Sequence, residues 1–239
     1  MSRSSERTRK LVILAMLSAL AYVLMVFGRV PVLTVPPFLK YDPKDVILVI
    51  GGFIFGPLSV LAMSIVVSFI EMITVSDTGI IGFAMNVVST CAFACTAAFI
   101  YKKMHSLKGA IIGLIVGWIA MALIMVLWNY IMTPIYLASL STGFSDMEAL
   151  SAAVSKIRPG VANMLIPIFL PFNLLKGGLN AAITMLVYKP VRTGLVKSRL
   201  LPDTSAAKAP SKINTGAMLV SAFVLLTGIL LILVYQGII

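Results

Sequence analysis

The chain has 239 residues, of which 60% are hydrophobic and only 11% are charged, and its mean hydropathy is +1.06. Soluble domains have roughly 45–50% apolar and about 25% charged residues, so a water-soluble fold of this size could not bury so much apolar surface. The net charge of +11 would suggest nucleic acid binding in a soluble protein, but here the basic residues flank apolar segments. The composition therefore predicts an integral membrane protein with the lipid bilayer, and no nucleic acid, as its partner.

The apolar runs are long and continuous, which is typical of transmembrane helices and not of the short alternating strands of a membrane barrel. Gly56-Pro57 divides one overlong run in two, because proline ends or kinks a helix. The fold class is thus predicted to be all-α. The expected helices, in chain order, are 11–28, 46–55, 58–75, 80–101, 109–137, 161–188 and 215–235.

The segments between these helices divide the chain into three parts. Residues 1–189 contain six of the helices and are expected to form the membrane core. Residues 190–214 are polar and basic, and we interpret them as a cytoplasmic linker. Residues 215–239 contain one additional transmembrane helix at the C-terminal end. Within the core, residues 138–160 are rich in polar side chains and are expected to form a loop.

The distribution of basic residues predicts the orientation in the membrane. With the N-terminus in the cytoplasm and the helices alternating in direction, the inner segments hold thirteen Lys and Arg residues and the outer loops hold five. This excess satisfies the positive-inside rule. We therefore expect a multi-pass protein of the cell (plasma) membrane with its N-terminus in the cytoplasm and its C-terminus outside. The inner segments are 1–10, 102–108 and 189–214, and the outer loops are 29–45, 76–79 and 138–160.

Several kinds of chemistry have no motif in this sequence. The sequence contains no G-x-x-x-x-G-K-[ST] motif, so ATP hydrolysis by the P-loop route is not expected. It contains no His/Glu cluster, so we expect neither a catalytic centre, nor a metal site, nor a bound cofactor. Cys91 and Cys95 lie one helical turn apart, where disulfide geometry is poor, and are expected to pack as inert side chains.

Polar residues inside the predicted helices are the strongest functional signal. Lys176 falls within the helix 161–188, and a lysine at membrane depth is costly and usually functional. Asn173 lies three residues before it and Asn180 four residues after it, so the three share one face. Asn129 lies near the outer end of the preceding helix, between Trp128 and Tyr130. The alternative is that such side chains only hold helices together.

The first outer loop adds aromatic and charged residues on the same side of the membrane. Its central stretch is Leu39, Lys40, Tyr41 and Asp42. Such a loop could simply lie on the membrane surface. Together with the polar ends of the helices, it predicts a capped cavity on the outer side. Aromatic walls with a few placed polar groups would suit a flat aromatic ligand with a polyol or amide edge.

These residues resemble a known family. Three stretches of the sequence, taken together, are similar to the riboflavin-specific S subunits of energy-coupling-factor (ECF) transporters. Each fragment alone is weak, but the order and spacing over roughly residues 11–189 make the set specific. The matching stretches are Leu39 to Asp45 leading into Ile50 to Pro57, Trp128-Asn129-Tyr130 followed by Pro134-Ile135-Tyr136, and Pro171 to Gly177.

The resemblance implies a six-helix substrate-binding core that captures riboflavin from outside. It also implies partners, a transmembrane coupling subunit and two cytoplasmic ATPases, so the chain would be a transporter subunit and not an enzyme. Family S subunits contact the coupling subunit through Ala-x-x-x-Ala on the first helix, here Ala15 and Ala19. The helix 215–235 is a departure from the family pattern. The implied substrate-binding residues are Leu39, Lys40, Tyr41, Asp42, Trp128, Asn129, Tyr130, Asn173 and Lys176.

Three other interpretations remain open at this point. The chain could be an S subunit for another small vitamin. It could be a self-sufficient ion-coupled carrier, although such carriers usually have inverted repeats and acidic residues at the membrane midplane, for which only Glu71 is a candidate. It could also be an intramembrane enzyme, which would chemically change its substrate. Dependence of uptake on a separate ATPase would distinguish the riboflavin-binding S subunit from the self-sufficient carrier.

Overall fold

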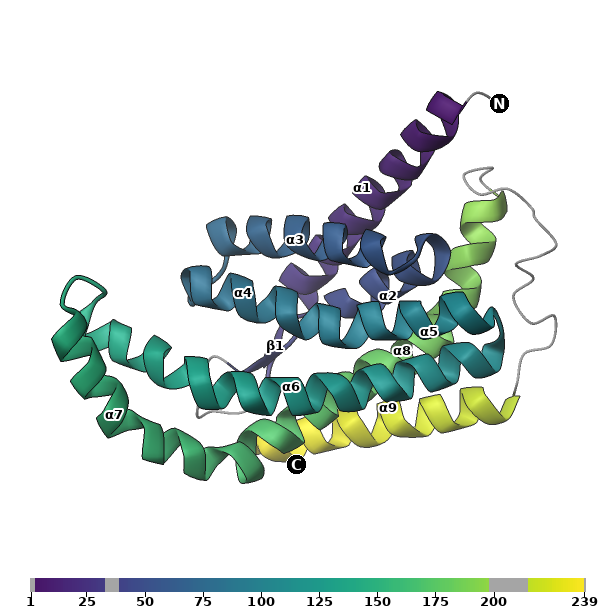
Figure 1. The fold of residues 1–239 in the computed structure, drawn as a ribbon. Helices are drawn as coiled ribbons and strands as arrows, with labels where there is room; N and C mark the ends of the chain where they lie inside the picture. The colour runs from purple at the N-terminus through teal and green to yellow at the C-terminus, as the bar shows by residue number, and fades with distance from the viewer. Residues whose placement is uncertain (1–2, 33–38, 198–214, 239) are drawn as a thin grey trace.

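The computed structural model describes residues 3–32, 39–197 and 215–238, and in these the chain is almost entirely helical (Figure 1). Five helical segments are long and apolar enough to cross a membrane, namely 6–28, 57–74, 79–104, 107–142 and 147–191. The predicted all-α membrane class is therefore confirmed. The helices are α1 (Arg3–Gly28), α2 (Lys44–Phe55), α3 (Pro57–Thr74), α4 (Gly79–Thr90), α5 (Thr96–Met104), α6 (Leu107–Thr142), α7 (Met147–Met164), α8 (Leu170–Lys197) and α9 (Thr215–Tyr235).

Two short π-helical segments and one small ribbon complete the described structure. The π segment Cys91–Cys95 joins α4 to α5, and Leu165–Phe169 joins α7 to α8. Strand β1 (Val30–Pro31) pairs antiparallel with β2 (Lys40–Tyr41). This ribbon follows α1 and precedes α2, so it lies within the predicted first outer loop.

The expected division at Gly56-Pro57 is present in the structure. α2 ends at Phe55, Gly56 adopts φ 90°, and α3 begins with Pro57 at its first position. Proline suits this position because its missing N–H would have no intrahelical partner there. The break lets the short α2 lie inside the molecule, where its residues from Lys44 to Phe53 are all buried.

The loop predicted over residues 138–160 is wrong. α6 continues through Pro134 to Thr142, and after a short turn the chain enters α7 at Met147. Asp146 caps α7 by accepting hydrogen bonds from the amides of Glu148 and Ala149, and carboxylates stabilise this end of a helix. The many polar side chains of this segment suggested a loop, but they lie on the exposed side of a helix whose other face is half-buried.

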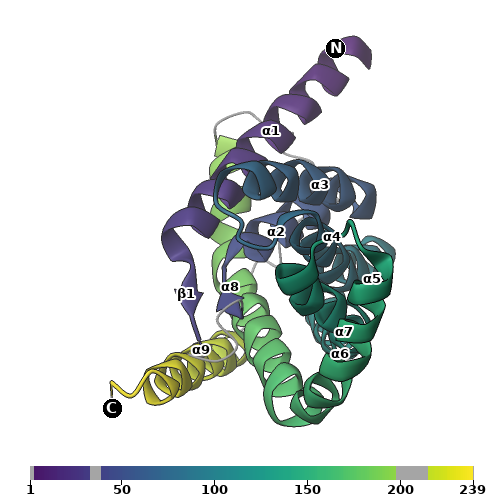
Figure 2. The same ribbon diagram turned by 90° about the vertical axis from the view of Figure 1, so that its left-hand side faces the viewer.

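The helix predicted to end at residue 188 also continues further. α8 runs through Pro190 to Lys197, so the first residues of the predicted linker are helical. The remainder of that linker, residues 198–214, lies outside the described residues. α9 spans Thr215–Tyr235, as predicted, and packs against α8. In Figure 2, α8 stands between α9 and the arm formed by α6 and α7.

The main apolar core surrounds α2. It joins α2 to buried side chains of α1, α3, α5 and α6. α6 approaches α5 and the π segment before it closely at two of its glycines. A Cβ on Gly113 would lie 2.7 Å from the carbonyl oxygen of Ala97, and a Cβ on Gly117 would overlap that of Phe93. Small residues allow such backbone approach, which drives helix packing in membranes.

We expect Gly117→Ala to destabilise the fold by about 1–3 kcal/mol, because the added methyl group must displace the backbone of the π segment. The measurement is the thermal unfolding midpoint of the purified protein. Gly160→Ala in α7 is the matched control, since nothing lies within 4 Å of that position. Equal midpoints for the two variants would contradict the close packing of α6 on the π segment between α4 and α5.

Candidate functional site

A polar hollow lies where the first loop meets α3, α4, α6 and α8. The hollow is partly open to solvent, and the space inside it that the centre of a water-sized sphere can reach is about 70 Å³. Both charged and apolar side chains face it, so its chemistry suits a ligand with a polar edge and an apolar face. Its lining residues are Arg29, Leu39, Lys40, Asp42, Glu71, Ser76, Asp77, Thr78, Met85, Asn86, Ser89, Met125, Asn129, Phe172, Asn173 and Lys176.

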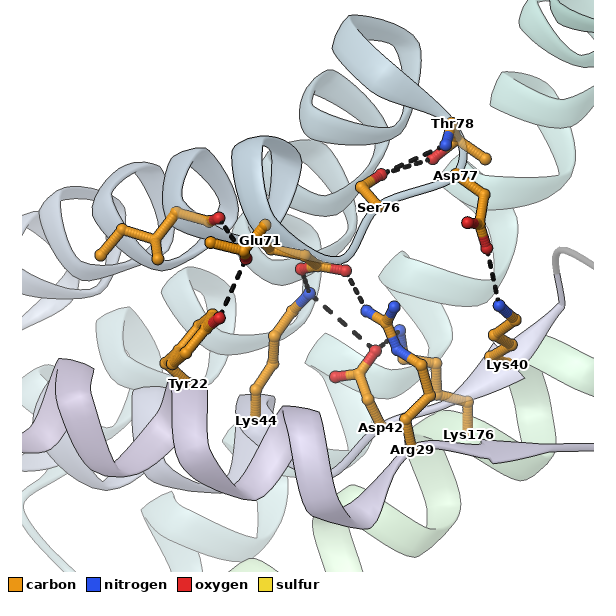
Figure 3. A network of polar contacts seen from close by, with 12 residues as sticks. Tyr22, Arg29, Lys40, Asp42, Lys44, Glu71, Ser76, Asp77, Thr78 and Lys176 are labelled. Atoms are coloured by element: carbon orange, nitrogen blue, oxygen red, sulfur yellow. Dashed lines mark hydrogen bonds and ion pairs between the residues drawn. The ribbon is translucent and has the colours of Figure 1, made fainter.

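Glu71 is the centre of a buried ion-pair network beneath this hollow (Figure 3). Near the C-terminal end of α3, it accepts hydrogen bonds from Arg29, which follows α1, and from Lys44 at 2.6 Å, which begins α2. Lys44 is completely buried and Glu71 is 3% exposed. The network therefore ties the ends of three helices together at the base of the first loop.

Asp42 extends the network to α8. Its Oδ2 atom lies 3.9 Å from the Lys44 ammonium and 3.6 Å from that of Lys176. Burial opposes ionisation of Asp42, but Lys176, Lys44 and Arg29 together hold the pKa of this carboxyl below its ordinary value. The other oxygen, Oδ1, is buried and has no hydrogen-bond partner among the described residues.

Lys176 has donor capacity left for a ligand. Its ammonium pairs with the Asp42 carboxylate at 3.6 Å, a contact that occupies at most one of its donors. The ammonium group carries three N–H donors. Since Lys176 is buried and lines the hollow, these donors can serve a group that enters it.

A second, exposed ion pair lies at the mouth. Lys40 of β2 donates a 2.9 Å hydrogen bond to Asp77 in the turn between α3 and α4. This hydrogen bond and the positive charge of Lys40 lower the pKa of Asp77. Because Asp77 is largely solvent-exposed, the pair contributes little to stability, but it places the first loop against the α3–α4 turn.

The two asparagines use their amide groups locally. Asn129 donates to the carbonyl of Met125 at 2.7 Å and accepts from Thr133 at 2.8 Å. Asn173 donates to the carbonyl of Phe169 at 2.7 Å. These bonds hold the side chains in fixed orientations at the wall of the hollow, which is the preorganisation that a binding site needs.

The structure brings six of the nine predicted site residues to the hollow and leaves three away from it. Tyr41 points to α8 instead, where its hydroxyl donates to Asn180 at 3.0 Å. Trp128 lines a separate, smaller crevice beside α4. Tyr130 is 41% exposed, with the guanidinium of Arg158 over its ring. The six at the hollow are Leu39, Lys40, Asp42, Asn129, Asn173 and Lys176.

Ala15 and Ala19 lie apart from this site, on the exposed side of α1. Met16 and Leu20, on the same helix, are 52% and 42% exposed. None of these four side chains lines the hollow. The small-residue face of α1 is therefore free within the described chain, and the hollow and this face are separate features.

Some lining residues were not among the predicted site residues. Glu71 carried a signal, since an acid in an apolar helix needs a partner, but Arg29 and Lys44 could not be assigned to it without the tertiary structure. Asn86 and Ser89 lie three residues apart on α4, a spacing that places them on one helical face. That spacing is the signal that could have located them.

Comparison with known proteins identifies the group to which this fold belongs. The sequence profile of the family described as "ECF transporter, substrate-specific component" matches residues 9–188. The chain belongs to this family. The polar hollow of this S component therefore lies within the part of the chain that matches the family.

Curated relatives and one solved structure agree with this assignment. The S component is 30% identical over 196 residues to riboflavin transporter FmnP of Bacillus subtilis (strain 168), covering 81% of this chain and 97% of that one. It is 27% identical to riboflavin transporter RibU of Staphylococcus aureus (strain TCH60), covering 77% and 90%. A solved S component of a bacterial ECF transporter matches with a TM-score of 0.60 at 28% identity, covering 79% of this chain and 98% of that chain.

We expect Glu71→Gln to destabilise the S component by about 3–5 kcal/mol, because Arg29 and Lys44 would lose the buried charge that balances them. Asp77→Asn is the control, since it breaks an exposed pair and should change the thermal midpoint little. The comparison is made by thermal unfolding of the purified proteins. Similar midpoints for both variants would contradict the role assigned to Glu71.

Proposed function

We propose that this S component binds riboflavin in the hollow, captures it from outside the cell, and delivers it inward as part of an ATP-driven ECF transporter. Its partners would be a transmembrane coupling subunit and two cytoplasmic ATPase subunits. Residues 1–189 would form the binding core and 190–214 a cytoplasmic linker. The observation that carries the proposal is the convergence of Lys176, Asn173, Asn129 and Asp42 on one hollow.

The lining chemistry supports riboflavin as the ligand. The vitamin has a flat aromatic ring system with polar edges and a ribityl chain that carries hydroxyl groups. Leu39, Phe172 and the methionines Met85 and Met125 provide apolar surface for the ring. The free donors of Lys176 and the unpaired acceptor on Asp42, described above, would satisfy ring-edge and hydroxyl groups. Both curated relatives described above are named as riboflavin transporters.

The charge distribution supports an outward-facing hollow. The turn 76–79 at the start of α4 contributes to the mouth, whereas the basic residues Lys102 and Lys103 lie at the end of α5 and Lys108 lies at the start of α6. The positive-inside rule places such basic segments in the cytoplasm. The hollow would then open to the outside, with the N-terminus in the cytoplasm and the C-terminus outside.

A separate energy source fits the sequence and the structure. The chain has no P-loop motif, so ATP hydrolysis by that route would belong to another subunit. In the described part of the chain, Glu71 pairs with Arg29 and Lys44, and Asp42 lies near Lys176 and the same Lys44. This pairing favours a structural role for these carboxylates over ion coupling, the alternative of a self-sufficient carrier. The other alternative, an S subunit for a different small vitamin, shares the fold and is decided by ligand binding.

We predict that Lys176→Ala and Asn173→Ala each weaken riboflavin binding about tenfold or more, because each removes hydrogen bonds to a buried ligand. Asn129→Ala should act in the same direction. Binding is measured by quenching of riboflavin fluorescence with purified protein. Lys156→Ala and Asn163→Ala, on the exposed side of α7, are matched controls that should bind as wild type.

Two outcomes of this titration would contradict the proposal. Wild-type affinity in a folded Lys176→Ala protein would remove Lys176 from the site. Absence of riboflavin binding by the wild-type protein, together with binding of another vitamin, would replace the ligand while keeping the family. Uptake that continues without any ATPase subunit would instead support the carrier.

The exposed small-residue face of α1 makes a separate prediction. Replacing Ala15 and Ala19 together by Leu should reduce co-purification of the coupling subunit, because small residues let a partner helix approach closely in the bilayer. Riboflavin binding should persist, since neither residue lines the hollow. Ala62→Leu on an exposed part of α3 is the control for added bulk. Normal co-purification by the double variant would show that this face contacts lipid only.

A further inference from the structure

The additional helix α9 contacts the first loop through a residue at its C-terminal end. The side-chain amide of Gln236 donates a 2.7 Å hydrogen bond to the backbone carbonyl oxygen of Pro31, 205 residues earlier in the chain. Pro31 belongs to β1, which pairs with β2. Since β2 carries Lys40 and leads directly into Asp42, the end of α9 is joined to the ribbon that brings two lining residues to the hollow.

The position of Gln236 is set by the way α9 ends. Gly237 adopts φ 69°, a left-handed conformation that suits glycine. Its amide donates to the carbonyl of Val234, and the amide of Ile238 donates to that of Leu233, both at 3.0 Å. These two bonds form a Schellman motif, which ends a helix at the residue before the glycine. Gln236 is therefore the C-cap residue, and its side chain is held where it meets β1.

α9 also supports the wall of the hollow from behind. Leu225 and Ile232 pack against a buried apolar cluster that joins the first loop to α8. Two members of this cluster, Leu39 and Phe172, also line the hollow. Gly228 brings α9 close to α8, because a Cβ there would overlap the side chain of Leu179. The buried cluster consists of Val32, Leu39, Tyr41, Val161, Phe169, Phe172 and Leu179.

The ribbon that α9 contacts has little stability of its own. It consists of two residue pairs, Val30 with Tyr41 and Pro31 with Lys40, and isolated two-stranded ribbons are marginal in water. Pro31 has no N–H group, so its carbonyl is its only backbone hydrogen-bonding group, and Gln236 uses it. α9 lies outside residues 9–188, the part matched by the family. The contact is thus an addition to the shared fold.

We propose that α9 is a positioning element of the ligand site, in which Gln236 and the apolar face of α9 hold the β1–β2 ribbon and Leu39 in their binding positions and so slow release of the bound ligand. The inference rests on the proposed function, because it assumes that riboflavin occupies the hollow. Gln236 would thus join the residues that govern ligand binding, although it lies outside the part of the chain that matches the family. Gln236 acts on the site through Pro31 and does not touch the hollow.

The test is the rate of riboflavin dissociation from the purified full chain, followed by recovery of flavin fluorescence after rapid dilution. Gln236→Met keeps the length of the side chain but removes the N–H donor, and should speed dissociation roughly two- to tenfold. The association rate should stay near that of wild type. Gln236→Lys restores an N–H donor of similar reach and should return the dissociation rate toward wild type. Gln236 is exposed, so these variants should fold.

A matched pair of apolar variants tests the second contact. Ile232→Ala removes a side chain that packs on the cluster, whereas Leu231→Ala changes its neighbour, which is 44% exposed on the outer side of α9. Only Ile232→Ala should speed dissociation. Wild-type dissociation rates in both Gln236→Met and Ile232→Ala would overturn the proposal.

A ligand-free measurement separates this inference from the proposed function. If the wild-type protein does not bind riboflavin, the proposed function fails, and amide hydrogen exchange then decides whether α9 supports the ribbon. Amides of residues 39–42 should exchange faster in Gln236→Met than in wild type. Equal exchange would overturn the role of α9, whatever ligand the protein binds.

Discussion

The pairing of buried charges at the base of the first loop is the interaction on which the rest of this structure depends. Glu71 forms ion pairs with Arg29 and Lys44, and Asp42 lies between Lys44 and Lys176. Charges at this depth are tolerated only when they are paired, because desolvation costs several kcal/mol per ion. The network joins the end of α1, the starts of α2 and α8, and the end of α3, so the loop that carries Leu39, Lys40 and Asp42 has a fixed base.

Above this base, two kinds of contact hold the residues of the site in place. Asn129 and Asn173 are oriented by hydrogen bonds within their own helices, while Lys176 keeps donors for a ligand. The first loop closes the other side through a short ribbon, an exposed pair between Lys40 and Asp77, and the contact from Gln236 of α9. Helices therefore hold one wall of the hollow, and a short ribbon with a few side-chain contacts holds the other.

The sequence was sufficient for the membrane class, the break at Gly56-Pro57 and the bounds of α9, because apolar runs and proline are local signals. The prediction of a loop over residues 138–160 was wrong, because Asp146 caps a helix whose many polar side chains are typical of loops. Periodicity and resemblance pointed to Lys176 and Asn173 at the hollow. Neither could show that Tyr41 turns to Asn180 or that Tyr130 faces outward, since rotamers and long-range partners such as Arg29 with Glu71 are set only by tertiary packing.

The central claim is that the hollow of this S component holds riboflavin, and the most direct measurement is the visible absorbance of the protein purified from cells supplied with the vitamin. The account predicts a yellow protein with the absorbance band of a flavin, and release of unmodified riboflavin in a one-to-one ratio when the protein is denatured. A folded protein that is colourless, and that stays colourless after purified riboflavin is added, would contradict it.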